Sequence, residues 1–199
     1  ISKRAKAETR TKFTSLMHLL NAKYLKECFA ELKRRKAAGI DGKVAEGYTE
    51  AEITQAIEDT IMELKWRSYR PQPVRRVYIE KANGQKRPLG IPTVMDKVIQ
   101  LGVTKILEAI YEPTFLPVSY GFRKGRNAHE GLKELNHKIM GQKVNWVIEA
   151  DIKGFFDHVD HGWMMRCLEE KIVDTPFKKL IERMLKAGIM EGGQYTASK

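Results

Sequence analysis

Two extended runs joined by a tight turn constrain the fold of this sequence more than any other feature. Residues 74–80 (VRRVYIE) and 85–91 (QKRPLGI) read as strands, and Asn83-Gly84 between them is the strongest short-range signal for a β-hairpin. Alternate side chains of a strand point to opposite faces, so one face of this basic hairpin need not be buried. We therefore expect the hairpin to project toward a ligand.

Helices are predicted on both sides of the hairpin, because apolar residues recur there every three or four positions. Thr49 and Glu52 have capping-box spacing at the start of one of them. The expected helices cover residues 13–20, 24–32, 51–66, 94–111, 127–140, 163–171 and 176–187. Gly192-Gly193 predicts a turn between two short strands. The fold class expected from this order is α+β.

A second apolar run, residues 146–152 (WVIEADI), is predicted to be a buried strand that ends in Asp151. A carboxylate in such a place is costly unless a cation meets it, and Mg²⁺ prefers one or two carboxylates with phosphates and water. The turn at Gly154 opens backbone N–H groups that can cradle a triphosphate. The residues alone equally allow Asp151 and Asp157 to be turn and capping residues.

Positive charge is concentrated in a few segments of this chain of 199 residues, whose net charge is +11. Residues 1–43 carry 12 basic and 4 acidic side chains, whereas residues 44–64 carry six acids and no base. Residues 65–87 carry eight basic side chains and one acid, with Trp66 and Tyr69 among them. Basic residues interleaved with aromatic ones favour a nucleic-acid partner. For the N-terminal cluster, a solvated helix surface is the alternative.

Several classes of protein are not expected from this sequence. No run of 18 apolar residues and no apolar leader segment is present, so neither a membrane span nor secretion is predicted. Cys28 and Cys167 lie far apart and lack CxxC spacing, which disfavours a zinc site or a disulfide scaffold. We expect a cytoplasmic or organellar protein.

Five segments in fixed order resemble the fingers and early palm of group II intron reverse transcriptases, also called intron maturases. The segments are RRKAAGIDG, YRPQPVRRVYI, KRPLGIPTVMDKVIQ, YEPTFLPVSYGFRKGRNAH and WVIEADIKGFFDHVDH. The resemblance covers roughly residues 34–199. It implies an RNA-directed DNA polymerase that also assists intron splicing and retrohoming, built from mostly helical fingers with a basic hairpin and the first part of a palm.

The resemblance implies a role for each matching residue. Asp151 matches the first catalytic, metal-binding aspartate, and Ile152 contributes a backbone carbonyl to the second of two Mg²⁺ ions. Phe155 matches the aromatic residue that selects deoxynucleotides. The positions that match those closing on the incoming dNTP are Arg75, Lys81 and Arg87.

Two further segments match regions that contact nucleic acid. Residues 34–42 resemble a loop that covers the RNA template, and Ser119–Arg126 resembles a block that lines the template and nucleotide site. The basic helices before them resemble the region that grips intron RNA. The nucleic-acid-binding residues implied are Lys12, Lys23, Lys26, Lys33, Arg34, Arg35, Lys36, Arg123, Lys124 and Arg126.

The expected domains are an N-terminal extension with fingers, residues 1–145, and a partial palm, residues 146–199. No YADD-like motif follows, so the chain is expected to be a fragment without polymerase activity of its own. The partners implied are group II intron RNA, an RNA template with a DNA primer, and dNTP. An unpaired sheet edge also makes a homodimer one expectation.

Two alternatives remain at this point. One is a reverse transcriptase of a retron, a diversity-generating element or a CRISPR-associated system. The other is a non-catalytic RNA-binding module.

Overall fold

A computed structural model describes residues 1–8, 10–80 and 84–198, with the backbone alone for residue 157. The chain forms two compact units, each built from segments that are distant in sequence. The first unit comprises Ile1–Thr11 and Glu108–Asp160, and the second comprises Lys12–Leu107 and His161–Lys199. The boundary expected at residues 145/146 remains a prediction about the polymerase domains.

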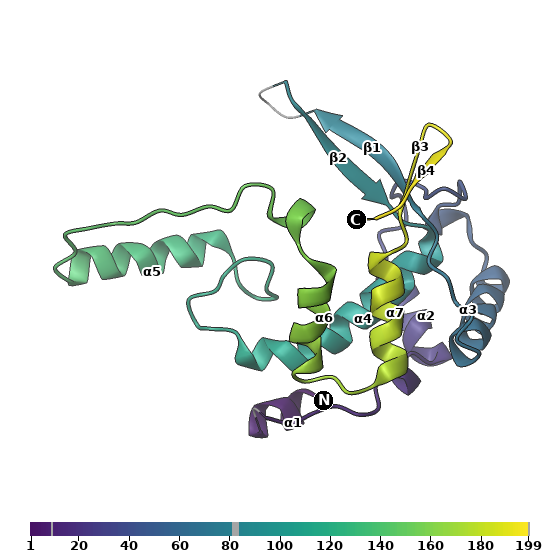
Figure 1. Cartoon of the computed structure of the whole chain (residues 1–199), viewed down its shortest axis with the longest axis horizontal. Coiled ribbons are helices and arrows are strands. Elements are labelled where there is room, and N and C mark those ends of the chain that lie inside the picture. The colour runs from purple at the N-terminus through teal and green to yellow at the C-terminus, as the bar shows by residue number, and fades with distance from the viewer. Residues whose placement is uncertain (9, 81–83, 199) are drawn as a thin grey trace. The chain divides into compact units, whose positions relative to one another are not determined.

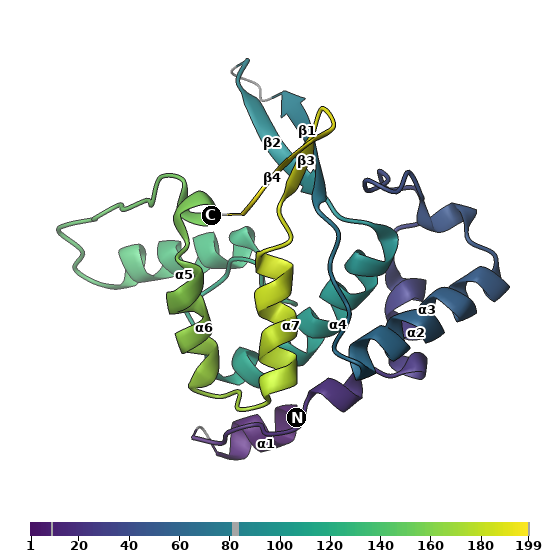
Figure 2. The ribbon, with the colours of Figure 1, turned by 45° about the vertical axis from the view of Figure 1, so that its right-hand side comes forward.

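The second unit contains a four-stranded sheet in the order β2-β1-β3-β4 (Figure 1). β1 (Val74–Glu80) and β2 (Lys86–Ile91) form the predicted antiparallel hairpin. β3 (Ile189–Glu191) pairs in parallel with the start of β1, and β4 (Gln194–Thr196) returns beside β3 after the turn at Gly192-Gly193 (Figure 2). The short second hairpin is thus confirmed, and the sheet joins it to the basic hairpin.

With one exception, the helices of the second unit bury one apolar face each, as their spacing predicts. The helices of this unit are α2 (Ala22–Glu31), α3 (Glu50–Lys65), α6 (His161–Glu169), α7 (Thr175–Leu185) and the part of α4 (Val94–Tyr111) up to Leu107. The exception is α6, which has no fully buried residue. The predicted capping box is present: the Thr49 hydroxyl accepts from the Glu52 N–H, and the Glu52 carboxylate accepts from the Thr49 N–H. Phe177, Ile57 and Val98 are fully buried.

The helix expected over residues 13–20 was wrong: only a 3₁₀ turn, η1 (Met17–Leu19), forms there. Tertiary contacts overrule the helical pattern. The Phe13 N–H donates to the Lys171 carbonyl at 2.7 Å, and Phe13 forms a parallel bridge with Ile172. The buried Asp174 carboxylate then accepts from the Met17 N–H at 2.9 Å and caps α7 through the Phe177 N–H at 3.0 Å.

The first unit contains α1 (Ser2–Ala7), η3 (Glu112–Thr114), α5 (Ala128–Gly141) and η4 (Phe155–His158). The Asn127 side chain caps α5 by accepting from the Glu130 N–H at 3.0 Å. Tyr120 donates to the Glu134 carboxylate, and its ring lies against Gly131. These contacts attach the loop before α5 to that helix.

The strand expected over residues 146–152 was also wrong, because the structure shows an extended segment outside the sheet. A strand needs a neighbour that satisfies its backbone groups, and none of the four described strands pairs with this one. The apolar side chains are consequently exposed, at 89% for Trp146 and 92% for Ile148.

Candidate nucleic-acid interface

The hairpin aligns two of the predicted nucleotide-binding arginines on one face. Cross-strand register pairs Arg75 with Ile91 and Arg87 with Ile79. Opposed residues of an antiparallel pair share a face, and so do alternate residues along each strand. Arg75 and Arg87 therefore lie on the same face of the hairpin, whereas Lys81 falls outside the described residues.

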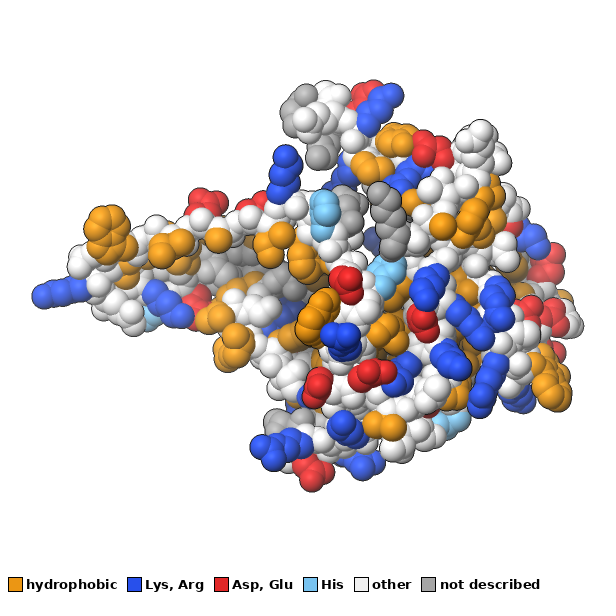
Figure 3. Space-filling model, in the orientation of Figure 1, with side chains coloured by type: hydrophobic (Ala, Val, Ile, Leu, Met, Phe, Trp, Pro, Cys, Tyr) orange, Lys and Arg blue, Asp and Glu red, His pale blue; other side chains and the backbone are white. Residues whose placement is uncertain are grey.

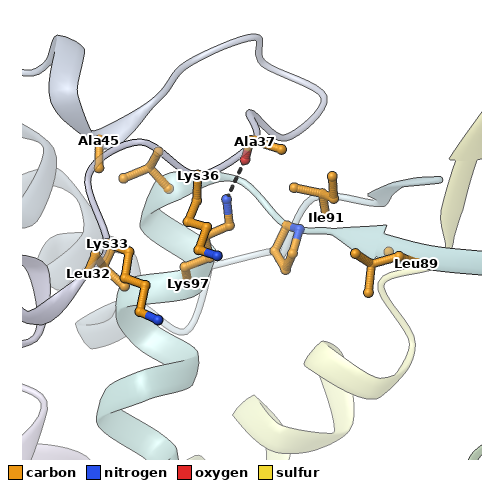
Figure 4. Close-up of a pocket in the computed structure, with 11 residues that line it drawn as sticks. Leu32, Lys33, Lys36, Ala37, Ala45, Leu89, Ile91 and Lys97 are labelled. Carbon is orange, nitrogen blue, oxygen red and sulfur yellow. Dashed lines mark hydrogen bonds between the residues drawn. The ribbon is translucent and has the colours of Figure 1, made fainter. Parts of the chain in front are cut away.

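A hollow of about 260 Å³ opens between this face and the segment after α2, and we call it the lysine groove (Figure 4). Its floor is apolar, and the described residues that line it include three lysines and no acid. The lining residues are Leu32, Lys33, Lys36, Ala37, Ala45, Leu89, Gly90, Ile91, Pro92, Val94 and Lys97. An apolar floor with a cationic rim suits a ligand that has flat bases and phosphates.

Residues 34–46 form one wall of the groove, and we call them the covering loop because they include residues 34–42, which were predicted to cover the template. This loop is held at its base and at its middle. At the base, the Glu46 N–H donates to the Arg34 carbonyl, and Arg35 pairs with Glu46 at 3.1 Å. At the middle, Gly39 packs so closely on Thr93 that a Cβ there would lie 2.7 Å from the Thr93 backbone. Only glycine allows this approach.

Two cations from outside the loop bind its backbone carbonyls. The Arg75 guanidinium donates from Nε at 3.0 Å and from Nη2 at 2.7 Å to the Ala38 carbonyl. The Lys97 ammonium, on α4, donates to the Ala37 carbonyl at 2.8 Å (Figure 4). Burial lowers the pKa of Lys97; Asp41 opposes this shift, and Arg75 adds to it.

The N-terminal basic cluster is exposed along α2 and the segment that follows it. Lys26 donates to the Thr54 hydroxyl at 3.0 Å, and Arg35 pairs with the exposed Glu46. The seven side chains of this cluster that were predicted to bind nucleic acid lie in the second unit and face solvent: Lys12, Lys23, Lys26, Lys33, Arg34, Arg35 and Lys36. Exposed cations of this kind can reach phosphates without first losing a buried partner.

The basic block in the first unit is used differently. The side chain of Arg123 is 8% exposed; it pairs with Glu112 at 2.7 Å and donates to the Leu116 and Ser119 carbonyls. Arg126 donates to the Pro117 carbonyl and lies over the Tyr120 ring. Lys124 is exposed. Arg123 and Arg126 thus shape their own loop, and the hydrogen bond from Arg123 lowers the pKa of Glu112.

The predicted catalytic segment is open to solvent. Asp151 is exposed, and Phe155 is 52% exposed with its ring edge-on to Phe156. The Asp151 carboxylate and the Ile152 carbonyl are oxygen ligands of the kind that Mg²⁺ prefers. However, no group of three His, Cys, Asp or Glu residues that could hold a metal ion occurs in the described part of the chain. The described residues therefore fit Mg²⁺ in kind but do not form a metal centre.

Sequence reasoning missed a basic surface on α7, which we call the α7 basic face: Lys179, Arg183 and Lys186 with Arg67 and Arg70. These residues line two neighbouring hollows, one of about 530 Å³ with Tyr195 at its edge. Figure 3 shows Lys and Arg side chains gathered over α7 and toward α3. The signal was the spacing of positions 179, 183 and 186 opposite the buried Phe177, Leu180 and Ile181. Acidic residues nearby in the sequence balance these cations, so the net charge of the segment did not reveal the α7 basic face.

Comparison with known proteins agrees with the resemblance. The family described as reverse transcriptase (RNA-dependent DNA polymerase) matches residues 79–199. The chain therefore belongs to the reverse transcriptase family. Within it, the chain is a member of the group II intron-encoded enzymes, the class that the five sequence segments predict.

The relatives support that placement. The group II intron-encoded protein LtrA of Lactococcus lactis subsp. cremoris is 42% identical over 200 residues, which cover 98% of this chain and 32% of the relative. Protein YkfC of Escherichia coli K12 is 34% identical, over 80% of this chain and 42% of its own length. Nuclear intron maturase 1 of Arabidopsis thaliana is 34% identical over 48% of this chain and 13% of its own length. The chain thus spans about a third of the length of LtrA.

Proposed function

We propose that this chain forms the template- and RNA-binding part of an RNA-directed DNA polymerase that also assists splicing of its intron. The observation that carries this proposal is the shared hairpin face of Arg75 and Arg87, set beside the lysine groove. That groove offers apolar contact for bases and cations for phosphates. The groove, which the covering loop borders, is our candidate for the template site.

Intron RNA is the proposed partner of the exposed N-terminal cluster. Its seven cations lie in the second unit, as does the lysine groove. The proposed nucleotide contacts are Arg75, Lys81, Arg87 and Phe155, and Lys124 is the exposed candidate for a template contact in the first unit. We place the complete protein in a bacterial cytoplasm or an organelle. In the described residues, no helix combines the length and apolarity needed to cross a membrane.

Mg²⁺ is the proposed metal of the complete polymerase. Asp151 and the Ile152 carbonyl are our candidates for this chain's contribution to the two-ion site. The described residues supply too few ligands for a metal centre of their own. RNA binding without catalysis is the second candidate function, which the seven exposed cations of the N-terminal cluster would serve equally well. Primer extension by the complete protein would separate the two, and an Asp151→Ala variant should abolish extension while leaving RNA binding intact.

The RNA-binding proposal is tested by salt titration with an RNA template annealed to a DNA primer. We expect Kd to rise steeply between about 50 and 200 mM salt. Removal of four cations, Lys33→Ala, Arg34→Ala, Arg35→Ala and Lys36→Ala, should lower affinity at least about tenfold and reduce the salt slope by roughly 2–3. Affinity that does not change with salt would overturn the electrostatic basis of the proposal.

The matched control is Asp151→Ala, which leaves every cation in place. Its RNA affinity should stay close to that of the unchanged chain. An equal loss in both variants would show that the catalytic segment, rather than the N-terminal surface, dominates binding.

A further inference from the structure

Two cations bound to backbone carbonyls attach the middle of the covering loop to the rest of the second unit. The Arg75 guanidinium on β1 donates hydrogen bonds to the Ala38 carbonyl, and the Lys97 ammonium on α4 donates to the Ala37 carbonyl. A carbonyl satisfies the donors but does not neutralise the charge. Such an attachment lacks the attraction between opposite charges that the same donors would gain from an anion.

In the described part of the chain, neither Arg75 nor Lys97 takes part in an ion pair. Lys33 and Lys36 line the same groove, and its described lining contains no carboxylate. Arg75 lies close enough to Lys97 to disfavour its charge, and Asp41, on the loop itself, is the acid whose field opposes this effect. Loop opening would withdraw Asp41 together with the two carbonyls. The loop and an incoming anion thus compete for the same cations.

We propose that Arg75 and Lys97 form a latch that holds the covering loop over the lysine groove, and that a phosphate-bearing ligand entering the groove releases it. In the latched state the two cations bind the Ala37 and Ala38 carbonyls; in the released state they bind phosphate oxygens. A ligand shifts such an equilibrium only by its difference in affinity for the two states, and here the released state offers it two more cations. Lys97 is a positioning residue, which acts on template or nucleotide through the loop.

The latch depends on the proposed function in one respect, that the phosphate belongs to a nucleic acid or a nucleotide. The opening of the loop can be tested without either ligand. Hydrogen exchange measured by mass spectrometry on loop peptides covering residues 36–42 reports loop opening directly.

The first test compares two substitutions in one helix. Lys97→Met removes the ammonium and keeps the stem, and we expect exchange of the loop peptides to speed up by about tenfold. Lys105→Met is the matched control: Lys105 also lies on α4, but it pairs with Glu31 at the surface. The control should leave loop exchange unchanged, and Lys97→Arg should restore most of the protection. Unchanged exchange in Lys97→Met would overturn the latch.

The second test uses inorganic tripolyphosphate as the anion. It should accelerate loop exchange in the unchanged chain and have little further effect in a Lys97→Met, Arg75→Met double variant, whose loop is already released. Slower exchange with tripolyphosphate would contradict release by anions. If Lys97→Met alters global unfolding, the Arg75→Lys variant takes its place in both tests. This substitution keeps the positive charge but loses the forked donor geometry of the guanidinium.

The outcomes separate the two proposals. A tripolyphosphate effect on the loop without template RNA binding would retain the latch and overturn the proposed function. RNA binding that depends on Lys33–Lys36 with no change in loop exchange would do the reverse.

Discussion

The lysine groove and the Asp151 segment differ in how their functional residues are supported. Around the groove, Arg75, Lys97 and Gly39 are fixed by contacts between the loop, β1 and α4. Along residues 146–156, the apolar side chains that would support Asp151 are exposed instead. A functional side chain is positioned by what packs beneath it. In this structure the residues around the groove have such support, and those of the catalytic segment do not.

The largest effect should come from contrasting a buried aromatic residue of the second unit with an exposed one of the Asp151 segment. Phe177 is fully buried on α7, so Phe177→Ala should lower the free energy of unfolding by about 3–5 kcal/mol. Trp146 is larger but 89% exposed, and Trp146→Ala should change the free energy of unfolding by less than about 0.5 kcal/mol. Urea denaturation of the 199-residue chain measures both. A large loss from Trp146→Ala would show that the segment is packed and that the two regions do not differ in support.

A smaller effect should distinguish the α7 basic face from the first unit. Lys179→Ala with Lys186→Ala removes two cations and leaves Glu182 without its partner, so RNA affinity should fall several-fold and the salt slope by roughly 1–1.5. The control pair, Lys133→Ala with Lys143→Ala, removes the same charge from the first unit. If the two pairs lose equal affinity, net charge alone explains binding and the α7 surface has no special role.

The smallest effect concerns the ion pair that shapes the loop of the first unit. Because Arg123 lowers the pKa of Glu112, the folded state favours the ionised carboxyl. That contribution is present above the unfolded pKa, about 4.3, and is lost as the pH falls through the lower folded value. The stability difference between the unchanged chain and Arg123→Gln should therefore be largest near neutral pH and shrink below about pH 4.

Urea midpoints measured across this pH range provide the check. Some difference should persist in acid, because Arg123 also donates to two backbone carbonyls. Glu112→Gln serves as the control, since it keeps those contacts and should remove the acid dependence. A difference that grows toward low pH would contradict this assignment.

Local signals predicted much of the fold. The hairpin, the capping box at Thr49 and the full span of α4 each depend on residues close in sequence, and each was confirmed. The helix over residues 13–20 was wrong because Phe13 pairs with Ile172, a partner that no local pattern reveals. The prediction of a strand over residues 146–152 was wrong because a high β propensity produces a strand only where another strand pairs with it.

The candidate site was predictable in part for a related reason. Side-chain types identified Arg75 and Arg87 as cations of the hairpin. The acceptors of Arg75 and Lys97, however, are backbone carbonyls, which every residue carries and no sequence pattern marks. The roles of Asp151, Ile152 and Phe155 stay predictions.

The parallel pairing of β1 with β3 has a consequence for how the chain folds during synthesis. Val74 pairs with Ile189, whereas the basic hairpin ends at Ile91, so the hairpin is complete almost a hundred residues before its third strand leaves the ribosome. At typical elongation rates of about 5–20 residues per second, the edge of β1 waits for several seconds without that neighbour. Unpaired strand edges invite other strands, so the nascent hairpin passes through an interval of exposure to misassembly. The charges along β1 then serve the growing chain as well as the finished protein, since they discourage premature edge pairing.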